Sequence, residues 1–100
     1  MEKFHHGITE AIQQLQEETD QQFTVLMRNG GMSIEYYAPE KIDTQTPHRQ
    51  DEIYVIAAGN GTFYRDGERV PFQTGAVLFV PAGMEHRFEN FSENFATGIK

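Results

Sequence analysis

The chain has 100 residues, no cysteine and a formal charge of −7, with fifteen acidic and eight basic side chains. This length predicts one domain, 1–100, with a single hydrophobic core. Without cysteine there is no disulfide, thiolate metal site or cysteine nucleophile. The acidic balance, with no Lys/Arg stripe to offset it, argues against nucleic acid as a partner.

The sequence also argues against export and membrane insertion. Residues 1–6 lack the apolar run and cleavage site of a secretory signal. Nowhere do eighteen apolar residues run together, so no membrane span is predicted. The expected compartment is therefore the cytoplasm.

One short helix is predicted near the N-terminus, over about residues 8–18. Ile8, Ile12 and Leu15 recur at helical spacing, while glutamine and glutamate cover the other side. Thr9 is the candidate cap. Because so short a helix is marginal alone, we expect its apolar stripe to pack on the rest of the domain or over a dimer seam.

Beyond residue 22 the apolar residues recur with the period of a strand. The expected strands are residues 23–28, 32–37, 53–57, 62–65, 68–72, 76–80, 86–91 and 95–99. Asn29-Gly30-Gly31 and Asp66-Gly67 predict hairpin turns, and residues 39–47 a polar loop. Short strands separated by turn signals are typical of an all-β sandwich or barrel.

The interior of this barrel is predicted from its apolar runs and its phenylalanines. Residues 53–57 and 76–80 are continuous apolar runs, and both predict buried strands. The phenylalanines expected in the core are Phe63, Phe72, Phe79 and Phe88.

The last expected strand, residues 95–99, stops almost as it starts. Either a further stretch of chain or pairing with a second chain would explain this. Because a small barrel has edges to protect, we expect a homodimer.

Two histidines and one glutamate carry the candidate chemistry. Glu52 opens an apolar strand, where a charge is costly unless it is paired, hydrated or bound to metal. His48 lies four residues earlier, roughly 13 Å away if the strand were straight. Residues 49–51 between them are all polar and predict a bend, which would bring the two side chains together. His86 follows a Pro-Ala-Gly turn that can aim it into the barrel.

Two spaced motifs resemble those of the cupin family. Gly75, Pro81, Gly83, His86 and Asn90 match the second cupin motif, G-x(5)-P-x-G-x(2)-H-x(3)-N, at every defined position. The first motif ends H-x-H-x(3,4)-E-x(6)-G, and its second histidine, its glutamate and its last glycine match His48, Glu52 and Gly59. Fifteen residues separate Gly59 from Gly75, the short linker of small microbial cupins. The resemblance covers residues 32–94. Residues 43–54 also resemble a subgroup of small cupins without an assigned function.

This resemblance implies a jelly-roll barrel with a divalent metal in its mouth, held by His48, Glu52 and His86. Thr46 stands where the motif has its first histidine, and Glu40 where it has its opening glycine. Two histidines and one carboxylate are the ligand set of non-haem Fe(II) oxygenases, although Mn, Ni, Co or Zn would also suit the site. The fourth position is open to Gln45, Thr46, Gln50 or water.

The remaining site residues have alternative interpretations. Gln45, Thr46, Gln50, Tyr54 and Phe88 are the candidate ligand-binding residues, and Gln50 and Tyr54 are also the candidate catalytic residues. Tyr54 could simply pack, while Asp51 is expected to face solvent or cap the bend. His48 and His86 could line an empty pocket as hydrogen-bonded histidines. His5 and His6 lie near the N-terminus and are not expected to bind metal.

Three functions are compatible with these features. The chain could be a metal-dependent enzyme of dioxygenase, isomerase or lyase type acting on a small organic metabolite. It could be a small-molecule-binding barrel without a functional metal, or a partner-binding protein with a vestigial site. The fold alone does not distinguish these functions.

Overall fold

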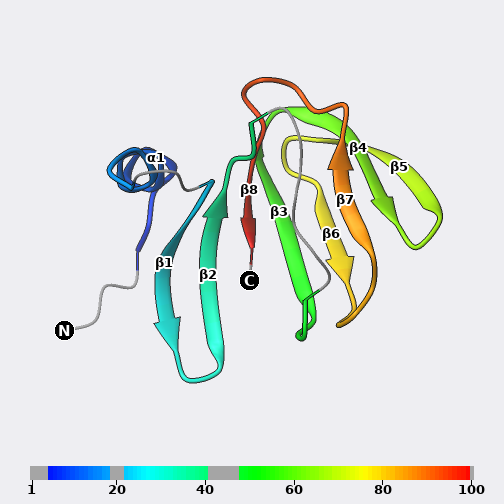
Figure 1. The fold of residues 1–100 in the computed structure, drawn as a ribbon. Helices are drawn as coiled ribbons and strands as arrows, with labels where there is room; N and C mark the ends of the chain where they lie inside the picture. Colours follow the sequence, from blue (N-terminus) through cyan, green and yellow to red (C-terminus); the bar gives the residue numbers. More distant parts are fainter. Residues whose placement is uncertain (1–4, 19–21, 41–47, 100) are drawn as a thin grey trace.

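The computed structural model describes residues 5–18, 22–40 and 48–99 (Figure 1). One helix, α1 (Ile8–Gln16), precedes the strands. The strands are β1 (Phe23–Asn29), β2 (Met32–Tyr37), β3 (Glu52–Ala58), β4 (Asn60–Arg65), β5 (Glu68–Gln73), β6 (Val77–Val80), β7 (His86–Glu89) and β8 (Ala96–Ile99). The predicted all-β class with one short helix is confirmed.

The strands form two antiparallel sheets. The larger sheet has the order β1-β2-β8-β3-β6, and the smaller has the order β5-β4-β7. In Figure 1, β8 lies between β2 and β3 although it ends the chain, while β6 is at the edge of its sheet. This order therefore brings the last strand and the centre of the chain side by side.

Tight turns hold the register where the sequence predicted hairpins. Asp66 and Gly67, with φ of 46° and 90°, join β4 to β5 in the backbone conformation that an Asp-Gly hairpin favours. The motif residues Gly59, Gly75 and Asn90 also have positive φ. Several motif positions are thus explained by backbone geometry, which glycine and asparagine tolerate.

The core lies between the two sheets and is largely aromatic. It is formed by Tyr37, Tyr54, Ile56, Phe63, Phe72, Val80, Phe88, Phe95 and Ile99, with Ala76, Leu78, Met84 and Phe91 packed against it. Phe88 packs against Phe95 with ring centroids 4.7 Å apart and meets the edge of Tyr54 at 5.1 Å. The interior of the barrel is therefore filled by side chains.

The two predicted buried strands are buried on one face only. Tyr54 and Ile56 point into the core, whereas Val55 between them is 48% exposed. On β6, Val77 is 66% and Phe79 49% exposed, so the prediction that Phe79 belongs to the core is wrong. A continuous apolar run implies burial on both faces only when something covers the outer one, and here nothing among the described residues does.

Helix α1 packs against the outer face of the larger sheet. Ala11 is buried there with Tyr36 and Ala96, and Leu15 packs against this cluster. Ile8 and Ile12 stay exposed, so the predicted stripe is only partly covered. The residue before the helix, Gly7, takes the N-cap position expected for Thr9, and the helix ends at Gln16 rather than residue 18. No helix in the described ranges is long and apolar enough to cross a membrane.

Side-chain hydrogen bonds fix the helix to β1. The Gln14 amide donates to the hydroxyl oxygen of Thr24 and to the carbonyl of Val25, both at 2.7 Å. The Thr24 hydroxyl in turn donates to the carboxylate of Glu18 at 2.6 Å. Because Thr24 is almost fully buried, this chain of bonds satisfies polar groups that would otherwise be costly.

Candidate metal centre

Two loops meet at one end of the barrel and are bound together there. His48 opens the bend before β3, and its carbonyl accepts a hydrogen bond from the Gly83 N–H at 2.7 Å. In the same bend, the Asp51 carboxylate accepts from the Ala82 N–H at 2.9 Å. Ala82 and Gly83 lie in the turn between β6 and β7. The turn that precedes His86 is therefore fixed to the bend that carries His48.

The three predicted metal ligands converge as a result. One ligand atom from each of His48, Glu52 and His86 can be chosen so that all three lie within 4.8 Å of one another. Oε1 of Glu52 lies 3.2 Å from Nε2 of His48 and 3.9 Å from Nε2 of His86. The predicted bend thus brings together two side chains that a straight strand would keep apart.

The ring of His86 is oriented by a hydrogen bond on each side. Its Nδ1 lies 2.9 Å from the carbonyl oxygen of Met84, which can only accept, so Nδ1 carries the hydrogen. In the neutral ring Nε2 is then an acceptor, and the Tyr54 hydroxyl donates to it at 2.9 Å. His86 and Tyr54 are both buried. The lone pair of Nε2 is therefore directed at the Tyr54 hydroxyl, and a metal ion that binds Nε2 would have to replace this hydrogen bond.

Glu52 is a buried carboxylate without full compensation. The residue is 8% exposed, and its Oε1 has no hydrogen-bond partner. His48 lies close enough for an ion pair but not in hydrogen-bonding geometry. Burial, and after it the charge of Glu35, raise the pKa of the Glu52 carboxyl from 4.5 to about 7, although the nearby Tyr54 hydroxyl lowers it. A positive charge beside this carboxylate would offset the cost of its burial.

Glu35 is a site neighbour that sequence reasoning missed. In the register of the larger sheet, Glu35 and Tyr54 both pair with Ile99, one from each side. This places Glu35 in the row that contains Tyr54, and its charge acts on Glu52. The alternating pattern of residues 32–37 predicts that the Glu35 side chain lies on the same face of its strand as Ser33 and Tyr37. Nothing in that pattern relates Glu35 to Glu52 on β3.

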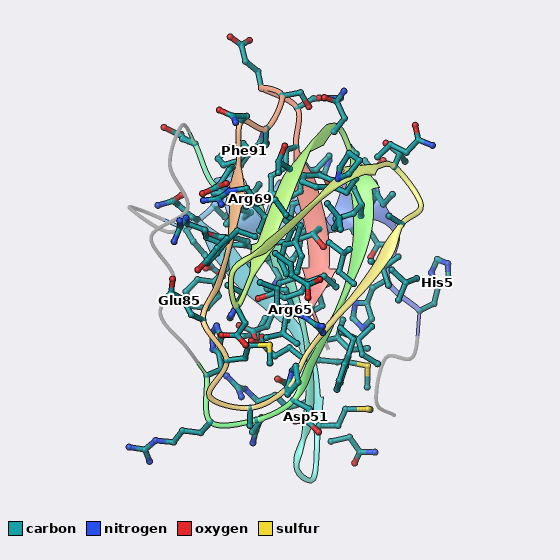
Figure 2. All side chains as sticks on the ribbon, turned by 90° about the vertical axis from the view of Figure 1, so that its right-hand side faces the viewer. His5, Asp51, Arg65, Arg69, Glu85 and Phe91 are labelled. Carbon is teal, nitrogen blue, oxygen red and sulfur yellow. The ribbon has the colours of Figure 1, made fainter. Side chains whose placement is uncertain are left out.

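The other predicted site residues are divided between the core and the surface. Tyr54 and Phe88 are buried, and Tyr54 contacts His86 directly. Gln50 and Asp51 are exposed, and Asp51 caps the neighbouring turn. Gln45 and Thr46 lie outside the described residues. Figure 2 shows His5 at the right-hand edge of the molecule and Asp51 at its lower end, well apart in this view.

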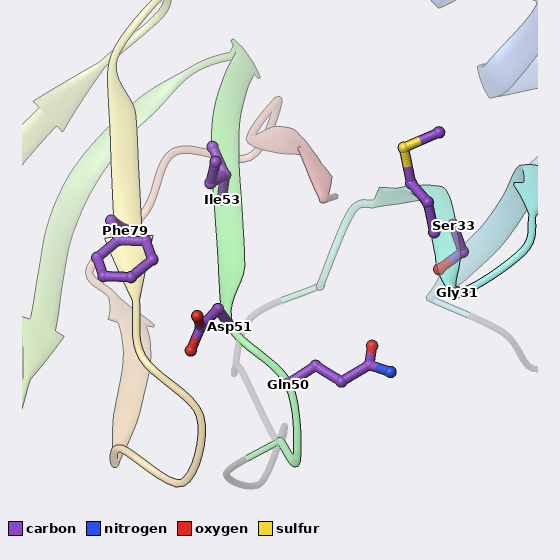
Figure 3. A pocket seen from close by; sticks show the side chains of 7 residues that line it. Gly31, Ser33, Gln50, Asp51, Ile53 and Phe79 are labelled. Carbon is purple, nitrogen blue, oxygen red and sulfur yellow. The ribbon is translucent and has the colours of Figure 1, made fainter.

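Access to the three ligands is through His48. Its side chain is 41% exposed, whereas that of His86 is fully buried. None of the surface hollows beside the bend, β5, β6, the helix or the loop before β8 that the described residues line includes a member of the triad. One of about 380 Å³ lies beside the bend and is lined in part by Gln50 and Asp51 (Figure 3).

The sequence model of the cupin domain matches residues 33–97, which include both motifs and all three candidate ligands. The chain belongs to the cupin family.

Several known proteins resemble the chain over different lengths. An uncharacterised protein of Streptomyces coelicolor is 34% identical over 77 residues, which are 75% of this chain and 73% of that protein. An oxalate-binding protein of Thermotoga maritima is 44% identical over 39 residues, only 39% of this chain and 32% of that protein. A cupin-2 domain protein of Shewanella frigidimarina shares the fold, with a TM-score of 0.69 and 16% identity over 88% of this chain and 87% of that chain.

Proposed function

We propose that this cupin binds a divalent metal ion through His48, Glu52 and His86 and holds a small organic molecule beside it. The observation that supports this most directly is Oε1 of Glu52, a buried oxygen without a hydrogen-bond partner that lies between two imidazole nitrogens. A buried carboxylate is costly unless it is neutralised, and a cation at this point would neutralise it. Imidazole and carboxylate together suit Fe, Mn, Ni, Co or Zn.

Each residue of the candidate site has a defined part in this proposal. The Met84 carbonyl holds the hydrogen of His86 on Nδ1 and so leaves Nε2 as the ligand atom, as outer partners of metal-binding histidines do, while the metal would replace the Tyr54 hydroxyl at Nε2. Glu52 supplies the negative charge. His48, the exposed member, lies where a ligand would enter. A bound divalent metal would supply a Lewis acid or redox centre with positions open to a ligand oxygen.

A second candidate function is a small-molecule-binding barrel without metal. It is favoured by the hydrogen bond between Tyr54 and Nε2 of His86, which gives that nitrogen a partner within the protein. The similarity of 39 residues to an oxalate-binding protein supports the binding of a small organic ligand in either case. Whether binding leads to catalysis depends on a proton-transfer group beside the ligands, for which Tyr54 is the candidate, whereas Gln50 could act only by hydrogen bonds to the ligand.

Calorimetric titration of the metal-free protein with Zn²⁺ tests the choice of ligands. We expect one site per chain, and a loss of affinity of at least about tenfold in His48→Ala and in Glu52→Gln. The matched control is His5→Ala/His6→Ala, which removes the other two histidines and should leave the titration unchanged. Equal affinity in wild type and Glu52→Gln would contradict the proposed site and favour the metal-free barrel.

A further inference from the structure

A β-bulge in β1 turns Arg28 toward the inner face of the larger sheet. Thr24 contacts the helix on the outer face, and strict alternation from there would place Arg28 on the outer face as well. The register shifts between Val25 and Met27, however, so Leu26 is an extra residue. Bulges of this kind re-aim side chains and are common beside functional sites.

The pairing of the next strand shows which face Arg28 shares. Arg28 pairs directly with Ser33 on β2. Two residues further along β2, Glu35 pairs with Ile99, which lies in the core. Directly paired residues, and every second residue of one strand, lie on the same face of a sheet. Arg28, Ser33 and Glu35 are therefore all on the inner face of the barrel.

Arg28 also lies at the same end of the barrel as the three candidate ligands. Glu35 and Tyr54 share one row of the larger sheet through β8. Two residues back along each strand, the next row contains Ser33 and Glu52, and Arg28 extends this row onto β1. Three strand spacings separate β1 from β3, so the two backbones are roughly 14 Å apart. A long side chain on β1 and a small ligand would together bridge this distance.

Space for such a ligand lies beside Ser33. A hollow of about 380 Å³ lies between the β1–β2 hairpin and the bend before β3, and its polar lining includes Ser33, Gln50 and Asp51. Figure 3 shows Ser33 and Gln50 on opposite sides of this hollow. A ligand next to Arg28 therefore has free volume beside it and a second hydrogen-bond donor in the Ser33 hydroxyl.

The guanidinium of Arg28 has no partner among the described residues. Arg69 and Arg87 on the smaller sheet share the carboxylate of Glu89. Arg28 is exposed and has neither an ion pair nor a hydrogen bond with any residue that the structure describes. Even Glu35, its diagonal neighbour on the inner face, forms no ion pair with it. This guanidinium is therefore available to a ligand.

The charge balance of this end of the barrel favours an anionic ligand. The two positive charges of a divalent metal would balance the carboxylates of Glu52 and Glu35, of which the second acts on the first. The imidazoles of His48 and His86 add no charge when they bind metal in the neutral form. The positive charge of Arg28 then remains. A carboxylate would neutralise it, because the planar guanidinium can donate to both of its oxygens.

We propose that Arg28 binds a carboxylate of the ligand, and that the ligands of this cupin are small organic acids. Ser33 donates a second hydrogen bond to the same carboxylate, while the other end of the ligand meets the metal. This inference rests on the proposed metal site. Because Arg28 is not a metal ligand, it affects the affinity for the organic acid and leaves the affinity for metal unchanged.

Titration of the zinc-loaded protein with succinate, followed by NMR chemical shifts, tests the proposal. We expect the dissociation constant for succinate to rise at least about tenfold in Arg28→Gln. Arg28→Lys should lose less, because it keeps the charge without the planar fork. The affinity for Zn²⁺ and the circular dichroism spectrum should be unchanged in both variants. The control is Arg69→Gln, which removes the same charge from the smaller sheet, well apart from Asp51 in Figure 2, and should leave succinate binding unchanged.

A second ligand separates a direct contact from a general effect of charge. Succinamide has the carbon skeleton of succinate without its charges, and it should bind wild type and Arg28→Gln equally weakly. Wild type that binds Zn²⁺ but not succinate would overturn this inference alone, as would an unchanged dissociation constant for succinate in Arg28→Gln. Wild type that binds no Zn²⁺ would contradict the proposed metal site and this inference with it.

Discussion

The hydroxyl of Tyr54 lies 2.9 Å from Nε2 of His86, the nitrogen that a metal at this site would need. The two residues are 32 positions apart in sequence, and both are buried. The phenol therefore gives the imidazole a partner when no metal is bound. A metal that binds Nε2 must replace this hydrogen bond.

This relationship predicts an unequal effect of Tyr54→Phe on the two states of the protein. Without metal, the substitution leaves Nε2 of His86 buried and unpaired, which should cost about 1–3 kcal/mol of unfolding free energy. With metal, Nε2 is occupied and the loss should be smaller. Urea unfolding with and without Zn²⁺ measures both values.

Tyr64→Phe is the control for this comparison. Tyr64 lies outside the site, with the guanidinium groups of Arg69 and Arg87 over its ring at 4.7 and 4.1 Å. Its loss of a hydroxyl should affect the two states equally. If Tyr54→Phe loses the same unfolding free energy with and without Zn²⁺, the phenol does not compete with metal for His86.

A second prediction concerns the stability of the metal-free protein as a function of pH. The pKa of Glu52 is raised from 4.5 to about 7, mainly by burial, so the folded state binds a proton that the unfolded state releases. The stability from this group is fully present below pH 4.5 and is lost as pH rises to about 7. Glu52→Gln should remove this loss and stabilise the metal-free protein by about 2 kcal/mol at pH 8.

Thermal unfolding of chelator-treated protein across this pH range measures the effect. As pH rises from 4.5 to about 7, the midpoint temperature of unfolding should fall further in wild type than in Glu52→Gln. If the two proteins respond to pH in parallel, Glu52 is not the buried, neutral carboxyl described here.

Metal affinity should show the opposite pH dependence. Binding requires ionised Glu52 and neutral imidazole, so the metal must displace the proton that Glu52 holds below about pH 7. The apparent affinity should therefore rise with pH up to about 7 and change less above it. Calorimetry in two buffers of different ionisation enthalpy should detect proton release on binding at pH 6, and none would be contrary to this assignment.

Local sequence signals were sufficient for most of the elements and for the bend between His48 and Glu52, whereas the ligand set was predicted from the resemblance to the cupin motifs. The hairpin at Asp66-Gly67 follows from residue types whose backbone preferences are strong, and the bend at residues 49–51 from a break in the apolar pattern. Burial was predicted less well, because an apolar run such as residues 76–80 does not reveal that β6 is an edge strand with one uncovered face. The contact between Tyr54 and His86 depends on how β3 and β7, from different sheets, face each other across the core, which no local pattern encodes.

The motif glycines give a prediction about stability. Gly59 has a φ of 94°, and a Cβ there would lie 2.5 Å from Oγ of Ser92 and 2.8 Å from Cα of Phe95. Gly59→Ala should therefore cost about 3 kcal/mol or more, because it adds a clash to the backbone strain. Gly67→Ala has a similar φ of 90° but open space, and should cost only about 1 kcal/mol. Equal costs, measured by urea unfolding, would show that the contact with Ser92 and Phe95 is unimportant.

The most direct test of the metal centre is elemental analysis of protein purified without chelators or metal-affinity resin. The account predicts close to one equivalent of a divalent transition metal per chain in wild type, and a loss of most of it in His86→Ala, since His86 is a buried ligand without a described substitute. Sub-stoichiometric metal in both proteins would contradict the metal centre and leave a barrel that binds its ligand without metal.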